Sequence, residues 1–343
     1  MKITNSLRPL RTKVRSLSGL WDAQRTLQPK GWSYKKHVDI SFLVPAHNEE
    51  KIISGTISHL LELPCKNYEI IVGLDGCTDG TGNIVKNFAK KNKKVKYFSL
   101  NLRKGKPAVI NHIIKKARGD IIIINDADWE FVVKDKKSFE KFIGVFDDKL
   151  VGGIAESFPV EWSRENLLAG NVWFKMVAYS SYYWLLFQKN KFTYLNKNQR
   201  YLKTHKMFLT NIFRKKLYRE NRSLGDDFER TYEIMKQGYK VAIFNEDNIP
   251  RMRSTYSKIK FKDLFKQKIR TAVARKQILE IEDIGLFNYY LPAVFFIMQE
   301  SFKKNISLGV LMLFWVFITS VGQLLSKFSK YDTKSGWTLR ATR

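Results

Sequence analysis

The stretch GDIIIINDAD, residues 119–128, decides the fold, because it joins four consecutive isoleucines to a polar, acidic end. An apolar run of β-branched residues bounded by a glycine and an asparagine is typical of a strand that is buried on both faces. Such strands occur in parallel sheets whose faces are covered by helices. The stretch therefore predicts a central strand over residues 119–126, with Asp126 and Asp128 at its carboxyl end.

Three similar runs precede this strand and alternate with helical segments. The runs DISFLVPA, YEIIVGLD and VKYFSL, at residues 39–46, 68–75 and 95–100, predict three more strands. We expect helices at residues 49–61, 83–91 and 106–117. This alternation predicts an α/β fold with a Rossmann-like, mostly parallel sheet and helices on both faces. Such sheets bind ligands at the carboxyl ends of their strands.

Acidic residues follow the predicted strands at that edge of the sheet. Glu49 comes after the first strand, Asp75 ends the second, and Asp126 and Asp128 end the fourth. Two carboxylates one residue apart at a strand end can bind a cation together with a phosphate-bearing ligand. The alternative for Asp128 is that it caps a following helix.

Two later segments add further polar groups to this pattern. LGDDFERTYEIMKQGYKVAIF, residues 224–244, places Asp226 and Asp227 at the start of an amphipathic helix, where either one can simply be an N-cap. KDLFKQKIRTAVARKQ, residues 262–277, is a basic amphipathic segment. Its cations either clamp a diphosphate or lie against a membrane.

Charge is the unusual feature of the composition. The 343 residues carry a formal net charge of +29, and the isoelectric point is about 9.9. This balance implies an anionic partner, which is a nucleic acid, an anionic membrane surface or a phosphorylated substrate. Two cysteines make neither a disulfide framework nor a four-ligand zinc site, and they fit a reducing compartment.

The apolar residues gather toward the end of the chain. ISLGVLMLFWVFITSVGQLL, residues 306–325, contains no charged residue, and as a helix it would be about 30 Å long, enough to cross a bilayer. GLFNYYLPAVFFIMQ, residues 285–299, is a shorter apolar segment with a proline. The first 21 residues contain no long apolar run, so we expect no secretory signal peptide. We therefore expect a membrane protein with its catalytic domain in the cytoplasm, although a buried core helix is the alternative for residues 306–325.

These observations divide the chain into five parts. We expect a basic arm that lies on anionic lipid or in solvent, an α/β domain, amphipathic interface helices, a membrane segment with one span or a hairpin, and a basic tail. Their predicted ranges are residues 1–37, 38–250, 251–284, 285–327 and 328–343.

Six motifs follow one another over roughly residues 39–275: VPAHNEE (44–50), LDGCTDGT (74–81), GKPAVIN (105–111), NDAD (125–128), LGDDFERTYEIMKQGYKVAIF (224–244) and Q-x-x-R (267–270). In order and spacing they resemble the motifs of family-2 glycosyltransferases of the GT-A fold, and especially of the membrane-bound members that extend oligosaccharides or glycosylate lipids. The chain departs from the family pattern at His47, Leu74 and Thr271, where the family commonly has Tyr, Asp and Trp. The missing Trp weakens assignment to the processive polysaccharide synthases.

The resemblance implies a role for each matching residue. Asp128 would ligate Mg²⁺ or Mn²⁺ across a diphosphate, and Asp126 would bind the nucleotide-sugar. Asp227 would be the general base, supported by Asp226. The implied nucleotide-binding residues are Pro45, Ala46, Glu49, Asp75 and Lys106, while Gln267 and Arg270 would close over the diphosphate and the acceptor entrance.

The implied activity is inverting, metal-dependent transfer of a sugar from a nucleoside-diphosphate sugar. UDP is the expected nucleotide and GDP the alternative; the acceptor is a lipid, a lipid-linked saccharide or a polysaccharide, and anionic membrane lipids are expected partners. Two other activities compete with this one. A nucleotidyltransferase of related fold would have no use for Asp227, Gln267 and Arg270. Nucleic-acid binding is not expected, because the basic residues are dispersed and no nucleic-acid-binding motif is present.

Overall fold

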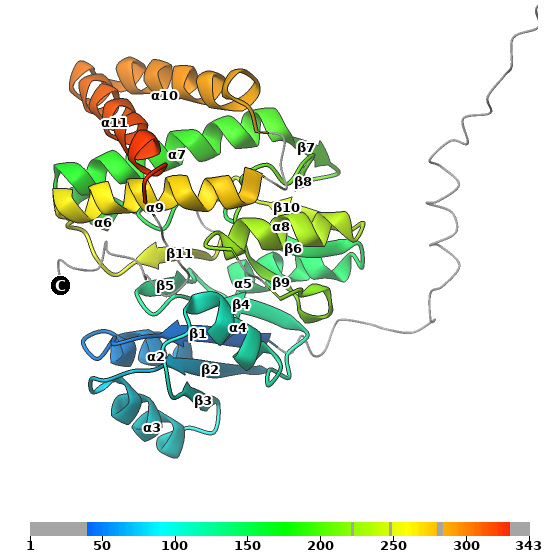
Figure 1. Cartoon of the computed structure of the whole chain (residues 1–343). Coiled ribbons are helices and arrows are strands. Elements are labelled where there is room, and N and C mark those ends of the chain that lie inside the picture. The colour runs from blue at the N-terminus through cyan, green and yellow to red at the C-terminus, as the bar shows by residue number, and fades with distance from the viewer. Residues whose placement is uncertain (1–39, 221–222, 247–248, 280–283, 330–343) are drawn as a thin grey trace, which may run out of the picture. The chain divides into compact units, whose positions relative to one another are not determined.

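The computed structural model describes residues 40–220, 223–246, 249–279 and 284–329. The basic arm predicted at residues 1–37 and nearly all of the predicted basic tail, from residue 330 on, lie outside the described residues. The rest is a mixed α/β structure with a group of long helices on one side (Figure 1).

A nine-stranded sheet forms the centre of the described chain. Its strands, in spatial order, are β3 (Val95–Leu100), β2 (Tyr68–Asp75), β1 (Ile40–Ala46), β4 (Ile121–Ile124), β9 (Thr210–Arg214), β6 (Val151–Ala155), β10 (Lys240–Ile243), β8 (Gln199–Leu202) and β7 (Thr193–Asn196).

The first four strands of this order are all parallel, as predicted from the sequence. Every residue of β1, β2 and β4 is buried, which explains their continuous apolar runs. The second half of the sheet is different, because β9 is antiparallel to both β4 and β6, and β7 and β8 form an antiparallel pair at the edge. Because β9 is antiparallel to both neighbours, β6 runs in the same direction as β4, and β10 is parallel to β6. The prediction of a mostly parallel sheet is therefore confirmed, with β9 and β8 as the antiparallel strands.

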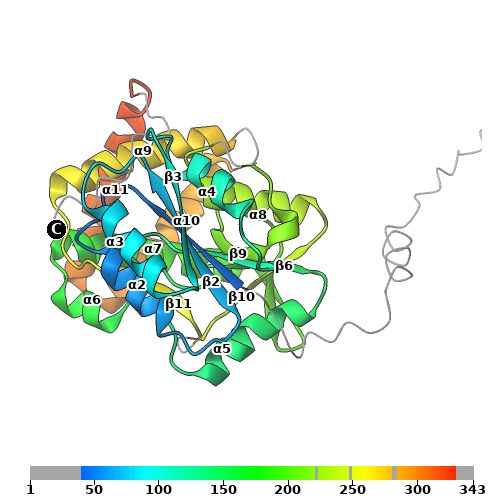
Figure 2. The same ribbon diagram turned by 90° about the horizontal axis from the view of Figure 1, so that it is seen from below.

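Helices cover both faces of the sheet, as predicted. Figure 2 shows α2 and α5 on one side of the strands and α4 and α8 on the other. Ile53 and Ile57 of α2 pack with Phe139 of α5 in one core, while Ile110 of α4 and Ile234 of α8 belong to the other. The bounds of these helices and of α3 are α2 Ile53–Leu61, α3 Thr81–Lys91, α4 Lys106–Ile114, α5 Lys136–Ile143 and α8 Asp226–Lys236.

A small second sheet follows the central strand β4. It pairs β5 (Trp129–Val132) with β11 (Arg251–Ser254) in antiparallel register, with Trp129 opposite Ser254. The residue after Asp128 therefore begins a strand, so the alternative that Asp128 caps a helix is wrong. This sheet brings the chain near residue 255 against the acidic end of β4.

The long helices form a separate layer, seen at the top of Figure 1. Their bounds are α7 Val172–Phe192, α9 Phe261–Leu279, α10 Leu291–Lys304 and α11 Ile306–Leu325, with the short α6 Arg164–Ala169 before α7 and a π-helical turn, Leu286–Tyr290, before α10. Buried side chains from all four long helices share one core, including Phe174, Leu264, Ile297 and Met312. Within the described chain, α11 is the one helix long and apolar enough to cross a membrane, and 33% of its apolar stretch is buried.

Candidate active site

Two adjoining cavities open at the carboxyl ends of the central strands. The larger, about 300 Å³, extends from the ends of β4 and β6 to the helices α7, α9 and α11. The smaller, about 70 Å³, lies beside the loops after β1 and β2. Both cavities are lined by Lys106, Asp126, Asp226 and Arg270, which therefore lie at their junction. This is the sheet edge at which the sequence predicts a ligand.

The acidic end of β4 is held in place by backbone hydrogen bonds. The side-chain amide of Asn125 donates to the carbonyls of Asp126 and Trp129 at 2.9 and 3.0 Å. The backbone N–H of Thr255 donates to the carbonyl of Asp128 at 3.0 Å. Because the turn is fixed on both sides, the carboxylates of Asp126 and Asp128 both line the larger cavity.

Lys106 is placed against Asp126 by the loop before α4. Both carboxylate oxygens of Asp75 accept from this loop, from the N–H groups of Lys104 at 2.7 Å and Gly105 at 2.9 Å. Gly105 has a φ of 92°, a conformation that favours glycine, and the helix begins at the next residue. The Lys106 ammonium then lies 2.9 Å from Asp126. Burial opposes its charge, but the surrounding carboxylates outweigh this and raise the pKa of Lys106.

The two acids at the start of α8 have different environments. Both belong to the first turn and the N-cap is Gly225, so the alternative that either one is the N-cap is wrong. Arg230 donates to Asp226 at 2.7 Å. Burial opposes ionisation of Asp226, but the charges of Lys106 and Arg230 outweigh it and hold its pKa below the usual value.

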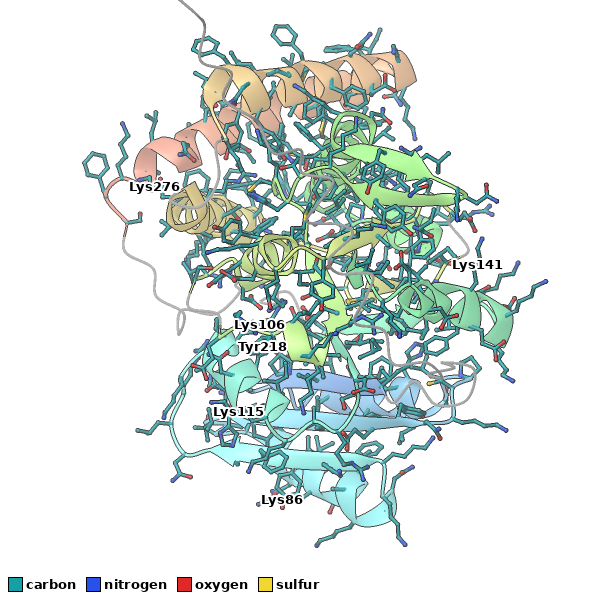
Figure 3. All side chains as sticks on the ribbon, turned by 90° about the vertical axis from the view of Figure 1, so that its right-hand side faces the viewer. Lys86, Lys106, Lys115, Lys141, Tyr218 and Lys276 are labelled. Atoms are coloured by element: carbon teal, nitrogen blue, oxygen red, sulfur yellow. The ribbon has the colours of Figure 1, made fainter. Side chains whose placement is uncertain are left out.

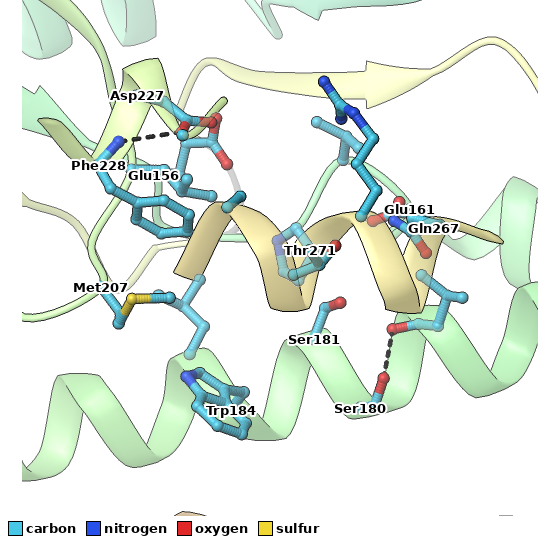
Figure 4. Close-up of a pocket in the computed structure, with 18 of the residues that line it drawn as sticks. Glu156, Glu161, Ser180, Ser181, Trp184, Met207, Asp227, Phe228, Gln267 and Thr271 are labelled. Atoms are coloured by element: carbon cyan, nitrogen blue, oxygen red, sulfur yellow. Dashed lines mark hydrogen bonds between the residues drawn. The ribbon is translucent and has the colours of Figure 1, made fainter. Parts of the chain in front are cut away.

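Asp227 lies at the cavity wall and accepts a hydrogen bond from the N–H of Phe228 at 3.0 Å (Figure 4). Burial and the negative charge of Asp226 raise the pKa of Asp227 to about 6. A carboxylate with such a pKa is deprotonated near neutral pH and is still basic enough to take up a proton. The two neighbouring acids are thus suited to different tasks.

The acids at the end of β4 fit a divalent cation that is shared with a ligand. Among the described residues, no cluster of three or more His, Cys, Asp or Glu side chains forms a metal site. Mg²⁺ usually needs only one or two protein carboxylates when substrate phosphates supply the other oxygens. Asp126 and Asp128 meet this requirement, because both are buried and face one cavity.

Helix α9 crosses the larger cavity and closes it on the side away from the sheet. Gln267 and Thr271 lie on its cavity-facing side in Figure 4, and Arg270 reaches the junction of the two cavities. The Oε1 atom of Gln267 is buried and accepts no hydrogen bond from any described residue. The structure thus brings both predicted Q-x-x-R residues to the same site as Asp227.

Glu49 is the one predicted residue that lines neither cavity. It is buried, its N–H donates to the Thr81 hydroxyl at 2.7 Å, and its carbonyl accepts from Ile52 and Ile53 at the start of α2. Its backbone therefore anchors the loop after β1. Pro45 and Ala46, from the same loop, do line the smaller cavity.

Two further acids, Glu156 and Glu161, line the larger cavity and were not predicted from the sequence. Glu156 follows β6 and accepts from the side-chain amide of Asn211 at 2.9 Å; burial and the charge of Asp227 raise its pKa to about 8. Burial likewise raises the pKa of Glu161. The run VGGIAE, an apolar strand ended by an acid, follows the same pattern as the end of β4 and could have revealed Glu156. The position of Glu161, in an irregular segment, carries no comparable signal.

Comparison with known proteins gives one family match and many relatives. The model of glycosyl transferase family 2 matches residues 41–222, more than half of the chain. The probable glycosyltransferase YdaM of Bacillus subtilis is 27% identical over 210 residues, which are 60% of this chain and 48% of that protein, so the match spans about half of the relative's length.

Two further proteins are similar over longer shares of their length. One is a dolichyl N-acetyl-alpha-D-glucosaminyl phosphate 3-beta-D-2,3-diacetamido-2,3-dideoxy-beta-D-glucuronosyltransferase of Methanococcus voltae, 26% identical over 69% of this chain and 72% of its own. The other is a solved structure, a mannosyltransferase of Pyrobaculum calidifontis, with 16% identity, a TM-score of 0.49 and coverage of 95% of this chain and 86% of that one. The family match, which covers more than half of the chain, shows that this protein belongs to glycosyl transferase family 2.

Proposed function

We propose that this protein is an inverting, metal-dependent GT-A glycosyltransferase that moves a sugar from a nucleoside-diphosphate sugar, with UDP as the expected nucleotide, to a lipid-borne acceptor at a membrane surface. One observation carries the proposal: Asp227 lines the same cavity as the Asp126–Asp128 pair, with Lys106 and Arg270 between the two cavities. A proton acceptor, a site for a cation and two cations thus surround one space. In a transfer reaction these groups can take up the acceptor's proton and offset the charge of a diphosphate leaving group.

The smaller cavity suits the nucleotide. Pro45, Ala46 and Asp75 line it, and Lys106 and Arg270 lie at its inner end, where the diphosphate would lie. Because both oxygens of Asp75 bind the backbone before α4, we assign it the task of shaping this loop and placing Lys106. Asp128, with Asp126, would hold Mg²⁺ or Mn²⁺, and the ion would offset the charge of the leaving diphosphate.

Asp227 would act on the acceptor from the larger cavity. Its carboxylate takes the proton of the acceptor hydroxyl while the oxygen bonds to the anomeric carbon. The bond from that carbon to the diphosphate breaks on the opposite face, so the configuration inverts. Lys106 and Arg270 stabilise the negative charge that moves onto the diphosphate. Asp226 supports the base because its charge raises the pKa of Asp227.

The helices α10 and α11 support the proposal that the protein acts at a membrane surface. Large apolar side chains are exposed along them, among them Phe295, Ile306, Val310, Leu313 and Phe317. Their other sides are buried against α7 and α9, and α10 has 14 residues, too few to span a bilayer core. We therefore favour a pair of helices that lies on the enzyme and enters one leaflet over a pair of spans.

The names of related proteins also support a lipid acceptor. The Methanococcus voltae relative carries a dolichyl phosphate acceptor in its name, and a Campylobacter jejuni relative, 22% identical over 58% of this chain and 65% of its own, is named for an undecaprenol-linked one. An exposed apolar surface beside the cavity would let such an acceptor reach Asp227 without leaving the membrane.

The test is release of nucleoside diphosphate by the full chain in detergent, with a panel of sugar nucleotides, native lipid extract and Mg²⁺ or Mn²⁺. We expect turnover with one nucleotide class and its loss on chelation. Asp227→Asn should lose about 10²–10⁴-fold in kcat while it still binds the donor. Glu233→Gln, on the same helix but outside both cavities, is the control. Full activity of Asp227→Asn, or no turnover with any donor, would refute the proposal.

A further inference from the structure

The larger cavity has a second cationic region, distant in the chain from Lys106. Lys268 and Arg275 lie two turns apart on α9, so they project from the same side of the helix, and both line the cavity where it meets α7 and α11. Apolar side chains and hydroxyls, including Val177, Ser181 and Ala274, also line the cavity, together with Glu161, whose charge acts on Lys268.

Both cations lie over aromatic rings. The Arg275 guanidinium lies 5.3 Å from the centre of the Trp184 ring and 5.6 Å from that of Tyr290. The Lys268 ammonium lies 5.5 Å from the centre of the Trp315 ring. Within the described chain, neither forms an ion pair, and the Nε of Arg275 is buried without a hydrogen-bond acceptor.

Two unneutralised cations in a confined cavity are costly unless an anion joins them. Burial and the charge of Arg275 lower the pKa of Lys268 to about 7, and the opposing influence of Glu161 is weaker than both. An anion bound here would relieve this repulsion and supply acceptors for the buried N–H groups. The donor diphosphate has its own cations, Lys106 and Arg270, at the junction of the cavities.

The surroundings of this end point to an anion that carries an apolar chain. Trp315 forms part of the cavity wall on α11, while its neighbours Leu313, Phe314 and Phe317 are exposed. One helix therefore separates the cationic end of the cavity from the exposed apolar face. A free phosphate would gain nothing from such walls, whereas a lipid phosphate would bury its first carbons against them.

We propose that Lys268 and Arg275 bind the phosphate of a lipid-borne acceptor and so present its reacting hydroxyl to Asp227. The proposal deepens the function proposed above and rests on it. It makes Lys268 and Arg275 acceptor-binding residues, separate from those that bind the donor.

The test is binding of farnesyl phosphate to the full chain in detergent, without donor, followed by tryptophan fluorescence, because Trp184 and Trp315 line the site. We expect farnesyl phosphate to bind at least ten times more tightly than farnesol or inorganic phosphate. Arg275→Gln and Lys268→Gln should each weaken farnesyl phosphate about tenfold or more, and Arg275→Lys should weaken it less. Lys266→Gln removes an exposed charge from the same helix and should change nothing.

Three results would overturn the proposal. The first is equal affinity of the wild-type chain and Arg275→Gln for farnesyl phosphate. The second is a loss of UDP affinity in Arg275→Gln as large as the loss for farnesyl phosphate, which would assign Arg275 to the donor. The third is that Arg275→Gln reduces binding to phosphatidylglycerol vesicles by the same factor, which would assign it to bilayer headgroups.

Circular dichroism of each variant separates unfolding from loss of the site. The outcome is independent of turnover, since binding without donor does not need the transfer reaction. If no sugar nucleotide supports turnover but farnesyl phosphate binds as described, the proposed function fails while the anion site stands.

Discussion

Arg230 donates to Asp226 at 2.7 Å inside the protein, one turn along α8, and this ion pair stands directly beside Asp227. The same guanidinium donates to the carbonyl of Thr210 at 2.9 Å and to the side chain of Asn211 at 2.7 Å, both on β9. Asn211 in turn donates to Glu156 at 2.9 Å. Arg230 therefore ties the start of α8 to the middle of the sheet, and through Asn211 it links Asp226 to Glu156, which both line the larger cavity.

Removing Arg230 should destabilise the fold. Arg230→Met leaves Asp226 as a buried charge without the hydrogen bond from Arg230, and loss of one partner of a buried pair costs about 3–5 kcal/mol. We expect a lower denaturation midpoint with an unchanged slope in urea. Lys236→Met, on the exposed last turn of the same helix, is the control and should change stability little. A midpoint equal to wild type would show that Asp226 does not depend on Arg230.

Activity should rise with pH through about 6, because Asp227 must be deprotonated to accept a proton and its pKa is raised to about 6. Asp226→Asn removes the neighbouring negative charge, so the pKa of Asp227 should fall. The acidic limb of the pH–activity profile should then shift to lower pH by roughly one pH unit. The measurement is kcat/KM against pH for wild type and variant, which reports the groups of the free enzyme. An acidic limb at the same pH in both would contradict the assignment of the base.

The charge state of Glu156 should make stability depend on pH. Its pKa is raised from 4.5 to about 8 in the folded protein, so the folded state binds this proton more tightly than the unfolded chain. The resulting stability is present below pH 4.5 and is lost as pH rises to about 8. Glu156→Gln keeps the neutral form, so its stability relative to wild type should increase from pH 5 to pH 8.5, by roughly 1–3 kcal/mol.

Urea denaturation at both pH values measures this difference. Glu233→Gln, on α8 and outside both cavities, should show no such pH-dependent gain. A constant difference between Glu156→Gln and wild type at the two pH values would mean that Glu156 is charged in the folded protein.

The exposed face of α11 should bind lipid. A Leu313→Glu, Phe317→Glu double variant places two charges on side chains that are 53% and 62% exposed, so folding should be retained while insertion into a leaflet is opposed. We expect the wild-type chain to float with phosphatidylglycerol vesicles and the double variant to be depleted severalfold from the floated fraction. Leu195→Glu, at an equally exposed apolar residue on β7, should float normally. Equal flotation of all three would exclude this face as the membrane contact.

Much of the N-terminal half could be predicted from local sequence. The strand predicted at residues 68–75 is β2, and that at 95–100 is β3, because an unbroken apolar or alternating run needs no distant partner to be recognised. Helix ends were less accurate: α2 begins at Ile53 rather than at Glu49, because residues 49–52 form a turn that Glu49 anchors. The C-terminal half was less predictable, since β9 owes its place between β4 and β6 to pairing across the fold.

The sequence by itself determined the α/β fold, the acids Asp126 and Asp128 at the end of a strand, and Asp227 at the start of a helix. Short-range patterns suffice for these, because apolar runs and strand ends follow from the chain's own periodicity. Only the tertiary structure decided which acid is paired and which can act as a base, since the partner Arg230 and the desolvation of Asp227 arise on folding. It also decided that Glu156, Lys268 and Arg275 face the same cavity. Burial and charge are properties of packed neighbours, and residues far apart in the chain become neighbours only in the fold.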